Sequence, residues 1–179
     1  LTSVTGSAGD TTLYSYRADG SLLTTTLPNG ITTSYTYDDA GRLASISHAK
    51  GTTLLSISYT RDENGNPTTI DDSLAGQSSY SFDALDQLTA EVRSGTTTTY
   101  TYDAVGNRLT KTVNGITTAS TYDDANQLTT AGTTTFTYDA NGGRVTRTQG
   151  GATTAYSYTS DNLLAGTSSP TTSTTNLYD

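Results

Sequence analysis

The stretch Tyr-Asp-Asp-Ala-Gly-Arg-Leu at residues 37–43 decides the fold, because its order of residue types returns along the chain. A tyrosine and an aspartate are followed by a short glycine-containing segment and then by a leucine or valine. Close copies begin at Tyr102, Tyr122 and Tyr138, and in the first and third of these one residue is inserted before the leucine or valine. Internal repetition of this kind indicates a repeat architecture.

The anchors of the repeat, meaning the residues at the position of Tyr37, recur at a nearly constant period. Successive anchors lie 16 to 24 residues apart. They are Tyr16, Tyr37, Arg61, Phe82, Tyr102, Tyr122, Tyr138, Tyr158 and Tyr178. Such a period is typical of solenoids and related arrays. We therefore expect residues 1–179 to form a single array of about eight repeats that is truncated at both ends.

Two turn signals separate two strands in each repeat. The Asp-x-x-Gly segment after an anchor favours a turn, because aspartate hydrogen-bonds to nearby backbone and glycine adopts a positive φ. Between anchors, Asn29-Gly30 and Asn114-Gly115 predict two-residue hairpin turns, in which both central residues need a positive φ. One strand is then expected over residues 31–37 and the next over residues 43–47.

Pairs of aromatic residues fall on one face of the expected strands, since residues two apart share a face. Each pair ends at an anchor: Tyr14 and Tyr16, Tyr35 and Tyr37, Tyr80 and Phe82, Tyr100 and Tyr102, Phe136 and Tyr138, Tyr156 and Tyr158. No long window shows helical periodicity, and glycine or proline interrupts most of them. The expected fold class is all-β, with consecutive hairpins joined into a long antiparallel sheet and no significant helix.

The recurring positions are assigned structural roles rather than chemical ones. They are the aromatic residues, the aspartates and glycines of the turns, and the apolar residue that follows each turn. The assigned repeat positions are Tyr16, Gly20, Leu22, Tyr35, Tyr37, Asp38, Gly41, Arg42, Leu43, Tyr80, Phe82, Asp83, Leu88, Tyr100, Tyr102, Asp103, Gly106, Leu109, Tyr122, Asp123, Leu128, Phe136, Tyr138, Asp139, Gly142, Val145, Tyr156, Tyr158 and Leu164. The assigned hairpin turns are Asn29, Gly30, Asn114 and Gly115.

Composition and charge exclude several classes of function. Hydrophobic residues make up 32% of the 179 residues, while 13 tyrosines favour strands with a thin core. A net charge of −8 and a pI near 4.3 argue against a nucleic-acid partner, which requires basic stripes. The absence of cysteine excludes disulfides and thiolate chemistry. No apolar run approaches the ~20 residues of a membrane-spanning helix.

The repeated segment resembles the signature of the YD-repeat or Rhs-repeat family, Tyr-Asp-x-x-Gly-Arg-Leu, which residues 37–43 match completely. The resemblance covers essentially the whole chain. It implies a sheet of hairpins that winds in a spiral. In family members such as Rhs toxins, the shell subunits of Tc toxins and teneurins, that sheet closes into a hollow shell. Either a shell wall or an open spiral or filament is therefore expected here.

Two interpretations are open for each prominent side-chain type. The tyrosine pairs line a sugar-binding groove or, as we favour, form the thin core. The recurrent aspartates bind Ca²⁺ or, as we favour, cap turns. The aspartates are Asp38, Asp62, Asp83, Asp103, Asp123 and Asp139. Arg42, Arg108 and Arg144 are expected to form a sparse column that pairs with neighbouring carboxylates.

Signals for catalysis are weak. His48 is the single histidine, and no Gly-x-Ser-x-Gly elbow accompanies it. The acidic pairs at residues 71–72 and 123–124 mean little without a cleft. The threonine runs at residues 96–99 and 133–135 are O-glycosylated or, more simply, form cross-strand pairs on the outer face. We expect no enzyme, no cofactor and no metal site.

The expected function is structural. The chain is predicted to be a segment of a secreted or cell-surface protein that forms the wall of a toxin-encasing shell or an extended fibre. Its expected partners are neighbouring repeats of the same longer chain, and either an encased C-terminal toxin domain or further copies joined through exposed strand edges. Nucleic-acid binding and membrane insertion are not expected. The alternatives are an adhesion or glycan-binding module and, last, a depolymerase-type enzyme.

Overall fold

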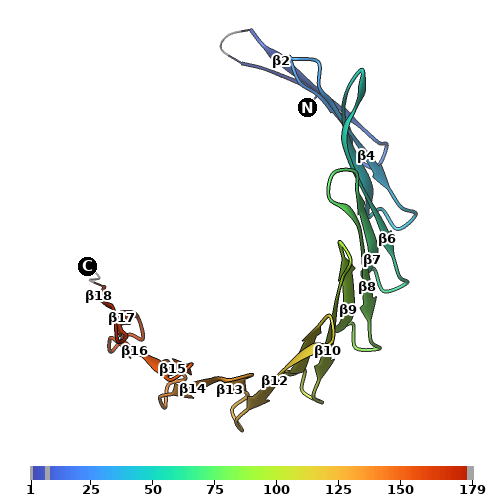
Figure 1. Cartoon of the computed structure of the whole chain (residues 1–179). Coiled ribbons are helices and arrows are strands. Elements are labelled where there is room, and N and C mark those ends of the chain that lie inside the picture. Colours follow the sequence, from blue (N-terminus) through green and yellow to red (C-terminus); the bar gives the residue numbers. More distant parts are fainter. Residues whose placement is uncertain (1, 7–8, 177–179) are drawn as a thin grey trace. The chain divides into compact units, whose positions relative to one another are not determined.

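The computed structural model describes residues 2–6 and 9–176, and these form β-strands joined by short turns, without any helix (Figure 1). The expected all-β fold of consecutive antiparallel hairpins is therefore confirmed. The chain divides into two units, Leu1–Thr97 and Thr98–Asp179. The described residues include no helix with the length and apolar character needed to span a bilayer.

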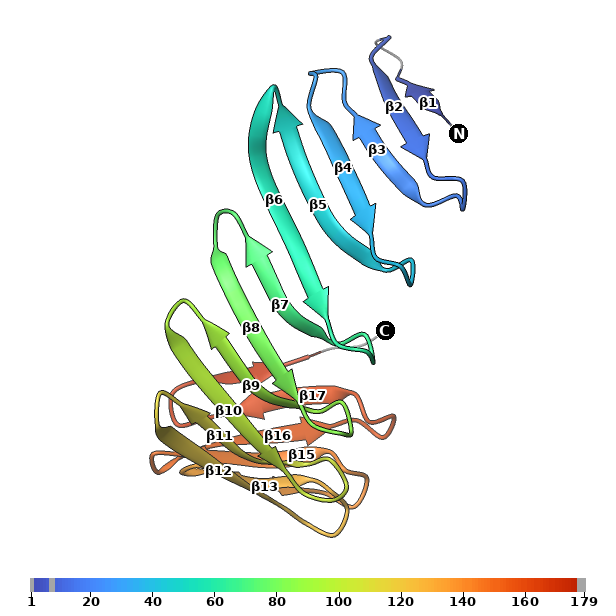
Figure 2. The ribbon, with the colours of Figure 1, turned by 90° about the vertical axis from the view of Figure 1, so that its right-hand side faces the viewer.

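The first unit is a single layer of strands that follow one another in chain order. From β1 to β9, each strand pairs antiparallel with its neighbour in this series, the last pair being β8 with β9, and Figure 2 shows them side by side. The strands are β1 (Ser3–Thr5), β2 (Thr11–Tyr16), β3 (Leu22–Thr26), β4 (Thr32–Tyr37), β5 (Leu43–Lys50), β6 (Thr52–Arg61), β7 (Pro67–Asp72), β8 (Gly76–Phe82) and β9 (Leu88–Arg93). The two strands expected at residues 31–37 and 43–47 correspond to β4 and β5.

The second unit repeats this arrangement. Strands β10 to β18 pair antiparallel in chain order. They are β10 (Thr96–Tyr102), β11 (Arg108–Val113), β12 (Ile116–Tyr122), β13 (Leu128–Ala131), β14 (Thr134–Tyr138), β15 (Arg144–Gln149), β16 (Ala152–Tyr158), β17 (Leu164–Ser168) and β18 (Ser173–Thr175). The anchor expected at Tyr178 lies outside the described residues, and the array of about eight repeats over residues 1–179 stays a prediction.

At each anchor that ends a described strand pair, the pairing shifts by one residue, because the following strand carries a β-bulge opposite the anchor. Thr36 faces Ser45, whereas Tyr37 faces Leu43, so Ala44 is the extra residue. A bulge of this kind leaves one residue unpaired and increases the local twist of the strands. The same shift occurs at the other anchors that end a described strand pair.

The bulges correct two of the expected repeat positions. Tyr102 faces Arg108, and Tyr138 faces Arg144, so these arginines occupy the register of Leu43. Leu109 and Val145 therefore take the place of the bulge residue. The turns of these two repeats are therefore as long as the turn after Tyr37, and the inserted residue predicted from the sequence is absent. In both repeats an arginine stands at the position that Leu43 holds after Tyr37.

The turn after an anchor is a three-residue hairpin loop. Asp38 N donates to Arg42 O at 2.9 Å, and Gly41 N donates to Asp38 O at 2.9 Å. Gly41 has a φ of 76°, which completes a type I turn followed by a left-handed residue. The same backbone hydrogen bonds recur in the loops that start at Asp62, Asp83, Asp103, Asp123, Asp139 and Thr159.

The turn at Asn29-Gly30 differs from the prediction, although that at Asn114-Gly115 agrees with it. Asn114 and Gly115 have φ values of 46° and 86°, as a two-residue type I′ turn requires. At the other site only Gly30 has a positive φ, and Leu27 N donates to Ile31 O across a three-residue loop. Pro28 explains the change, because its fixed φ suits the second position of a type I turn.

The expected apolar core is absent from the described residues. No apolar side chain among them is buried, and the most buried side chains are hydroxyls. These are Thr33, Ser78, Thr98, Ser120 and Thr134, which are 7–8% exposed. The tyrosine rings are mostly half-buried, and Tyr16 is 41% exposed. A single-layer sheet covers its rings only from the sides, through neighbouring strands, so the prediction of a packed tyrosine core was wrong.

Candidate functional site

Several described repeats are tied to the preceding one at a point that we call the repeat junction: an anchor side chain and the carbonyl that it reaches. Tyr37 Oη donates to Leu22 O at 2.8 Å, and Leu22 is the residue that faces the preceding anchor, Tyr16. The same bond recurs in the second unit. There Tyr122 donates to Arg108 O at 3.0 Å, Tyr138 to Leu128 O at 2.9 Å and Tyr158 to Arg144 O at 3.2 Å.

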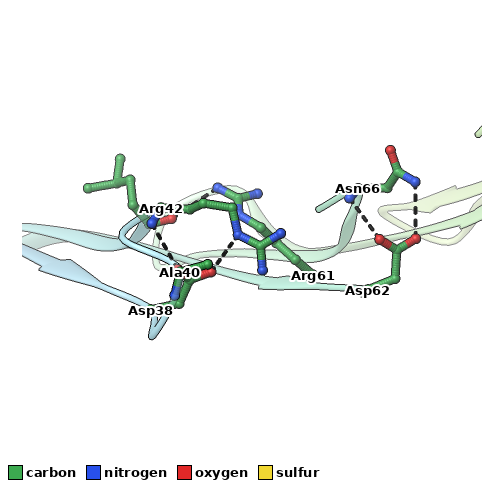
Figure 3. A network of polar contacts seen from close by, with 7 residues as sticks. Asp38, Ala40, Arg42, Arg61, Asp62 and Asn66 are labelled. Atoms are coloured by element: carbon green, nitrogen blue, oxygen red, sulfur yellow. Dashed lines mark hydrogen bonds and ion pairs between the residues drawn. The ribbon is translucent and has the colours of Figure 1, made fainter. Parts of the chain in front are cut away.

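Arg61 preserves the repeat junction without a tyrosine. The Arg61 side chain is drawn in Figure 3. Its Nη2 donates to Leu43 O at 2.9 Å, and Leu43 is the residue that faces the anchor Tyr37. The Arg61 guanidinium also lies 5.2 Å from the centre of the Tyr59 ring. A guanidinium can therefore replace a phenol here, because both are long side chains that end in a hydrogen-bond donor.

Phe82 is the anchor that cannot form this bond, since its ring carries no hydroxyl. The corresponding acceptor is Pro67 O, because Pro67 faces the anchor Arg61. In the turn that follows Phe82, Gln87 Oε1 is buried and has no hydrogen-bond partner. Phe82 thus lacks the junction hydrogen bond that Tyr37 and Arg61 make in the same unit.

Replacing Phe82 by tyrosine is expected to stabilise the protein. The new hydroxyl would reach Pro67 O, and a hydrogen bond of this type contributes about 0.5–1.5 kcal/mol. Urea unfolding followed by circular dichroism measures the gain. Phe136→Tyr is the matched control, because Phe136 lies two residues before an anchor rather than at one. An equal or lower stability of Phe82→Tyr would contradict the proposed equivalence of the junctions.

Where an aspartate follows an anchor in the described residues, it caps the turn. Asp38 Oδ1 accepts hydrogen bonds from Ala40 N at 3.0 Å and Arg42 N at 2.8 Å, and Asp38 Oδ2 accepts from Arg42 Nε at 2.8 Å (Figure 3). The bond from the fifth turn residue to Oδ1 recurs in every such turn. Its donors are Arg42, Asn66, Gln87, Asn107, Gln127 and Gly143. The carboxylates are therefore used to close turns.

Side chains at the fifth turn position strengthen the cap and link successive turns. Asn66 Nδ2 donates to Asp62 Oδ2 at 3.1 Å, in the way that Arg42 Nε contacts Asp38. The same amide donates to Asp86 Oδ1 of the next turn at 2.6 Å. The sequence predicted this carboxylate contact for Arg42, but the equivalent role of carboxamides such as Asn66 was not predicted.

The caps lower the pKa of several aspartates. The Arg42 side chain and backbone N–H hold the pKa of Asp38 below its usual value. For Asp62 and Asp103, burial alone would raise the pKa, but hydrogen bonds from Asn66 and Asn107 outweigh it and lower the pKa. Backbone N–H groups of the turns likewise lower the pKa of Asp19 and Asp72.

The lowered pKa values predict a loss of stability in acid. A carboxyl whose pKa is lower in the folded chain stabilises it above the unfolded pKa of about 4, and this contribution disappears as the pH falls through the folded pKa. The midpoint temperature of thermal unfolding is therefore expected to be constant from neutral pH to about pH 4. Below about pH 4 this midpoint temperature should fall. Asp38→Asn and Asp103→Asn, which keep an acceptor oxygen, should weaken this dependence. A midpoint unchanged in strong acid would refute it.

The face of the sheet opposite the anchor rings carries a ladder of hydroxyl pairs. The residue before an anchor bonds to a hydroxyl on the next strand, at 2.6–2.7 Å between oxygens. The pairs are Ser15–Thr24, Thr36–Ser45, Thr60–Thr69, Thr101–Thr110, Thr121–Thr130 and Thr137–Thr146. These hydroxyls satisfy one another within the sheet, as cross-strand threonine pairs do.

The arginines do not form the expected column. Arg42 belongs to a turn and pairs with Asp38, whereas Arg108 and Arg144 lie against aromatic rings. The Arg144 guanidinium is 5.8 Å from the Phe136 ring centre and 4.3 Å from that of Tyr156. The column prediction was wrong, because the arginines occupy two different positions of the repeat.

The side chains expected as candidates for catalysis or metal binding are not grouped into a site among the described residues. None of them form a group of three or more histidine, aspartate or glutamate side chains placed to hold a metal ion. His48 Nδ1 contacts Thr33 Oγ1 at 2.9 Å across a strand pair, and Asp72 caps Leu74 N and Ala75 N. A hollow of about 340 Å³ between β16, β17 and β18 is bordered by Ser157, Gly166 and Thr175. No carboxylate or histidine lines it.

Two family models match different parts of the chain. A family model described as Teneurin YD-shell matches residues 66–179, and one described as RHS Repeat matches residues 17–53. A search of curated protein sequences found no match.

Several solved structures share the fold. A crystal structure of TcdB2-TccC3-Cdc42 superposes with a TM-score of 0.59 at 16% identity over 93% of this chain, and one of TcdB2-TccC3-TEV with 0.59 at 24% identity over 90%. The Tc holotoxin pore of Photorhabdus luminescens, carrying a mutation in TccC3, gives 0.53 at 17% identity over 93%. The chain spans only 12%, 9% and 12% of those longer chains. At these identities the likeness concerns the fold.

Proposed function

Because the chain belongs to the teneurin YD-shell family, we propose that it is a non-catalytic wall segment of a secreted or surface-exposed shell that encases a toxin domain. The longer proteins that share its fold include a component of a Tc holotoxin. A wall needs cohesion from one repeat to the next and has no need of a reactive cleft.

The observation that carries this proposal is the use of polar side chains. Anchor hydroxyls bind the preceding repeat, aspartates close turns, and threonine hydroxyls pair across strands. Where the pKa of a carboxyl is shifted, the shift is downward, which keeps it ionised and in its cap. Catalytic carboxylic acids instead have raised pKa values. The chemistry that the residues possess is thus already used to hold the sheet together.

Electron microscopy of the full-length protein that carries this segment tests the proposal. Closed hollow particles are expected, together with protection of an enclosed domain from added protease. A version in which Tyr37, Tyr122, Tyr138 and Tyr158 are phenylalanine should leave that domain more accessible. Open fibres, or a domain digested equally in both versions, would rule out an encasing wall. A glycan array run on the same protein distinguishes the adhesion alternative, which requires specific binding.

A further inference from the structure

The second unit has all of its positive charge on one face of its sheet. Its basic side chains are Arg108, Lys111, Arg144 and Arg147. Each of them lies directly opposite an aromatic residue, and the partners, in the same order, are Tyr102, Tyr100, Tyr138 and Phe136. Residues directly opposite each other in an antiparallel pair share a face. The four cations therefore lie on the face that carries the rings, and we call this surface the basic face.

The β-bulges arrange these cations in two pairs. Arg108 and Lys111 are three residues apart, and residues three apart on a regular strand point to opposite faces. Leu109 is the extra residue of the bulge, so both cations come to lie on the same face. The strand that carries Arg144 and Arg147 is built in the same way.

The sheet itself does not require cations at these positions. In the other repeats whose pairing is described, the residue that faces the anchor is apolar: Leu22, Leu43, Pro67, Leu88, Leu128 and Leu164. The position of Lys111 and Arg147 is held in the first unit by Thr25, Ile46, Ile70 and Glu91. The two basic pairs thus belong to particular repeats and not to the repeat pattern.

Carboxylates of the described chain do not neutralise the basic face. The described residues form two ion pairs, and both lie in the first unit. The described acidic residues of the second unit all lie in turns, and they are Asp103, Asp123, Asp124, Asp139 and Asp161. Arg147 Nη2 donates to Oε1 of Gln149, which is a neutral carboxamide. The positive charge of this face is therefore available to an acidic ligand.

The two arginines nearest the anchors are held against rings in a way that suits carboxylate binding. The Arg108 guanidinium lies 5.9 Å from the Tyr100 ring centre, and the Arg144 guanidinium lies 4.3 Å from that of Tyr156. A guanidinium over a ring still presents N–H donors in its own plane, in the fork geometry that matches a carboxylate. Arg144 Nε is buried without a hydrogen-bond partner, which is a desolvation cost that a bound carboxylate would offset.

We propose that the basic face binds an extended acidic segment of another protein, with carboxylates on both basic pairs. The pairs lie on β11 and β15, four strands apart, which is roughly 19 Å at the usual strand spacing. An extended chain covers that distance in about six residues. Such binding would be a property of the second unit alone and does not depend on the encasing role.

A peptide segment suits this face better than a long polyanion such as a nucleic acid. Tyr122 and Phe136 lie on β12 and β14, between the basic pairs, and their rings offer contact to apolar side chains of the segment. The aspartates in the turns of the same unit repel negative charge that extends past the edge of the sheet. The ligand should therefore carry its charge in two short groups separated by apolar residues.

Fluorescence anisotropy with the whole chain and a labelled peptide tests this proposal. The probe has two glutamates on each side of six alternating threonine and valine residues, and a matched peptide has glutamines in their place. The glutamate peptide is expected to bind saturably and more weakly as salt is added, whereas the glutamine peptide should not bind. Lys111→Gln combined with Arg147→Gln should weaken binding about tenfold or more.

Lys50→Gln combined with Arg93→Gln is the matched control, because it removes the same charge from the first unit. It should leave the affinity unchanged, as should Lys111→Arg combined with Arg147→Lys, which keeps the charge of the basic face. Circular dichroism checks that each variant is folded. Equal losses in the two glutamine variants, or no saturable binding of the glutamate peptide, overturn the proposal. So does tighter binding of a DNA oligonucleotide through Lys111 and Arg147, which would identify a polyanion site instead.

Discussion

Replacing Tyr122, Tyr138 and Tyr158 together by phenylalanine is expected to lower the free energy of unfolding by about 3 kcal/mol, at about 1 kcal/mol for each lost hydrogen bond. Each hydroxyl donates to a carbonyl of the preceding repeat in the second unit. The rings remain, so packing against neighbouring strands is preserved. Urea unfolding followed by circular dichroism measures the loss.

Tyr35→Phe and Tyr156→Phe provide the matched controls. These residues precede anchors by two positions, so they lie on the same face of the same strands as Tyr37 and Tyr158. No hydrogen bond from either hydroxyl occurs among the described residues, and their loss should change the stability little. If the control replacements destabilise the chain as much as the triple replacement, the anchor hydroxyls have no special role.

Gly106→Val is expected to cost about 2–3 kcal/mol, since a β-branched residue is strained at a positive φ. Gly106 has a φ of 91°, and no atom lies within 4 Å of the position that a Cβ would take. The cost is therefore conformational and does not arise from a clash. The same unfolding measurement detects it.

The chain supplies its own control for this replacement. Asn126 and Asn162 occupy the equivalent turn position, with φ values of 60° and 62°. Asparagine tolerates this region because its short polar side chain hydrogen-bonds locally. Gly106→Asn should accordingly be nearly neutral. A valine variant as stable as the asparagine variant would show that this turn does not require the left-handed conformation.

Local signals in the sequence were sufficient for the strands, the hairpins and most turns. The aspartate and glycine after Tyr37 predict a turn because each acts on its own backbone, and alternation along β4 predicts the shared face of Tyr35 and Tyr37. Such effects require no knowledge of neighbouring repeats. They therefore predict the all-β fold and the position of nearly every hairpin.

The features that depend on register or on a neighbouring repeat were not predicted. Residues 29–33 and 114–118 have the same sequence, yet their turns differ. Pro28 favours the second position of a type I turn, so the loop at Asn29 has three residues instead of two. The sequence suggested one inserted residue between Tyr102 and Leu109, whereas Arg108 faces Tyr102 and Leu109 is the bulge residue. The order of residue types does not reveal which residue forms a bulge. The role of Arg61 was missed because a guanidinium replaces a phenol only where both reach the same carbonyl.

The direction of the anchor bonds has a consequence for how the chain is made. The five anchor bonds described for Tyr37, Arg61, Tyr122, Tyr138 and Tyr158 all point backward, from a donor to an acceptor 10 to 18 residues earlier. Contacts this local close quickly, and a chain emerging from the ribosome already holds each acceptor when its donor appears. The protein can thus fold vectorially from its amino-terminal side. Interrupted translation would leave a product that is ordered up to its last complete hairpin.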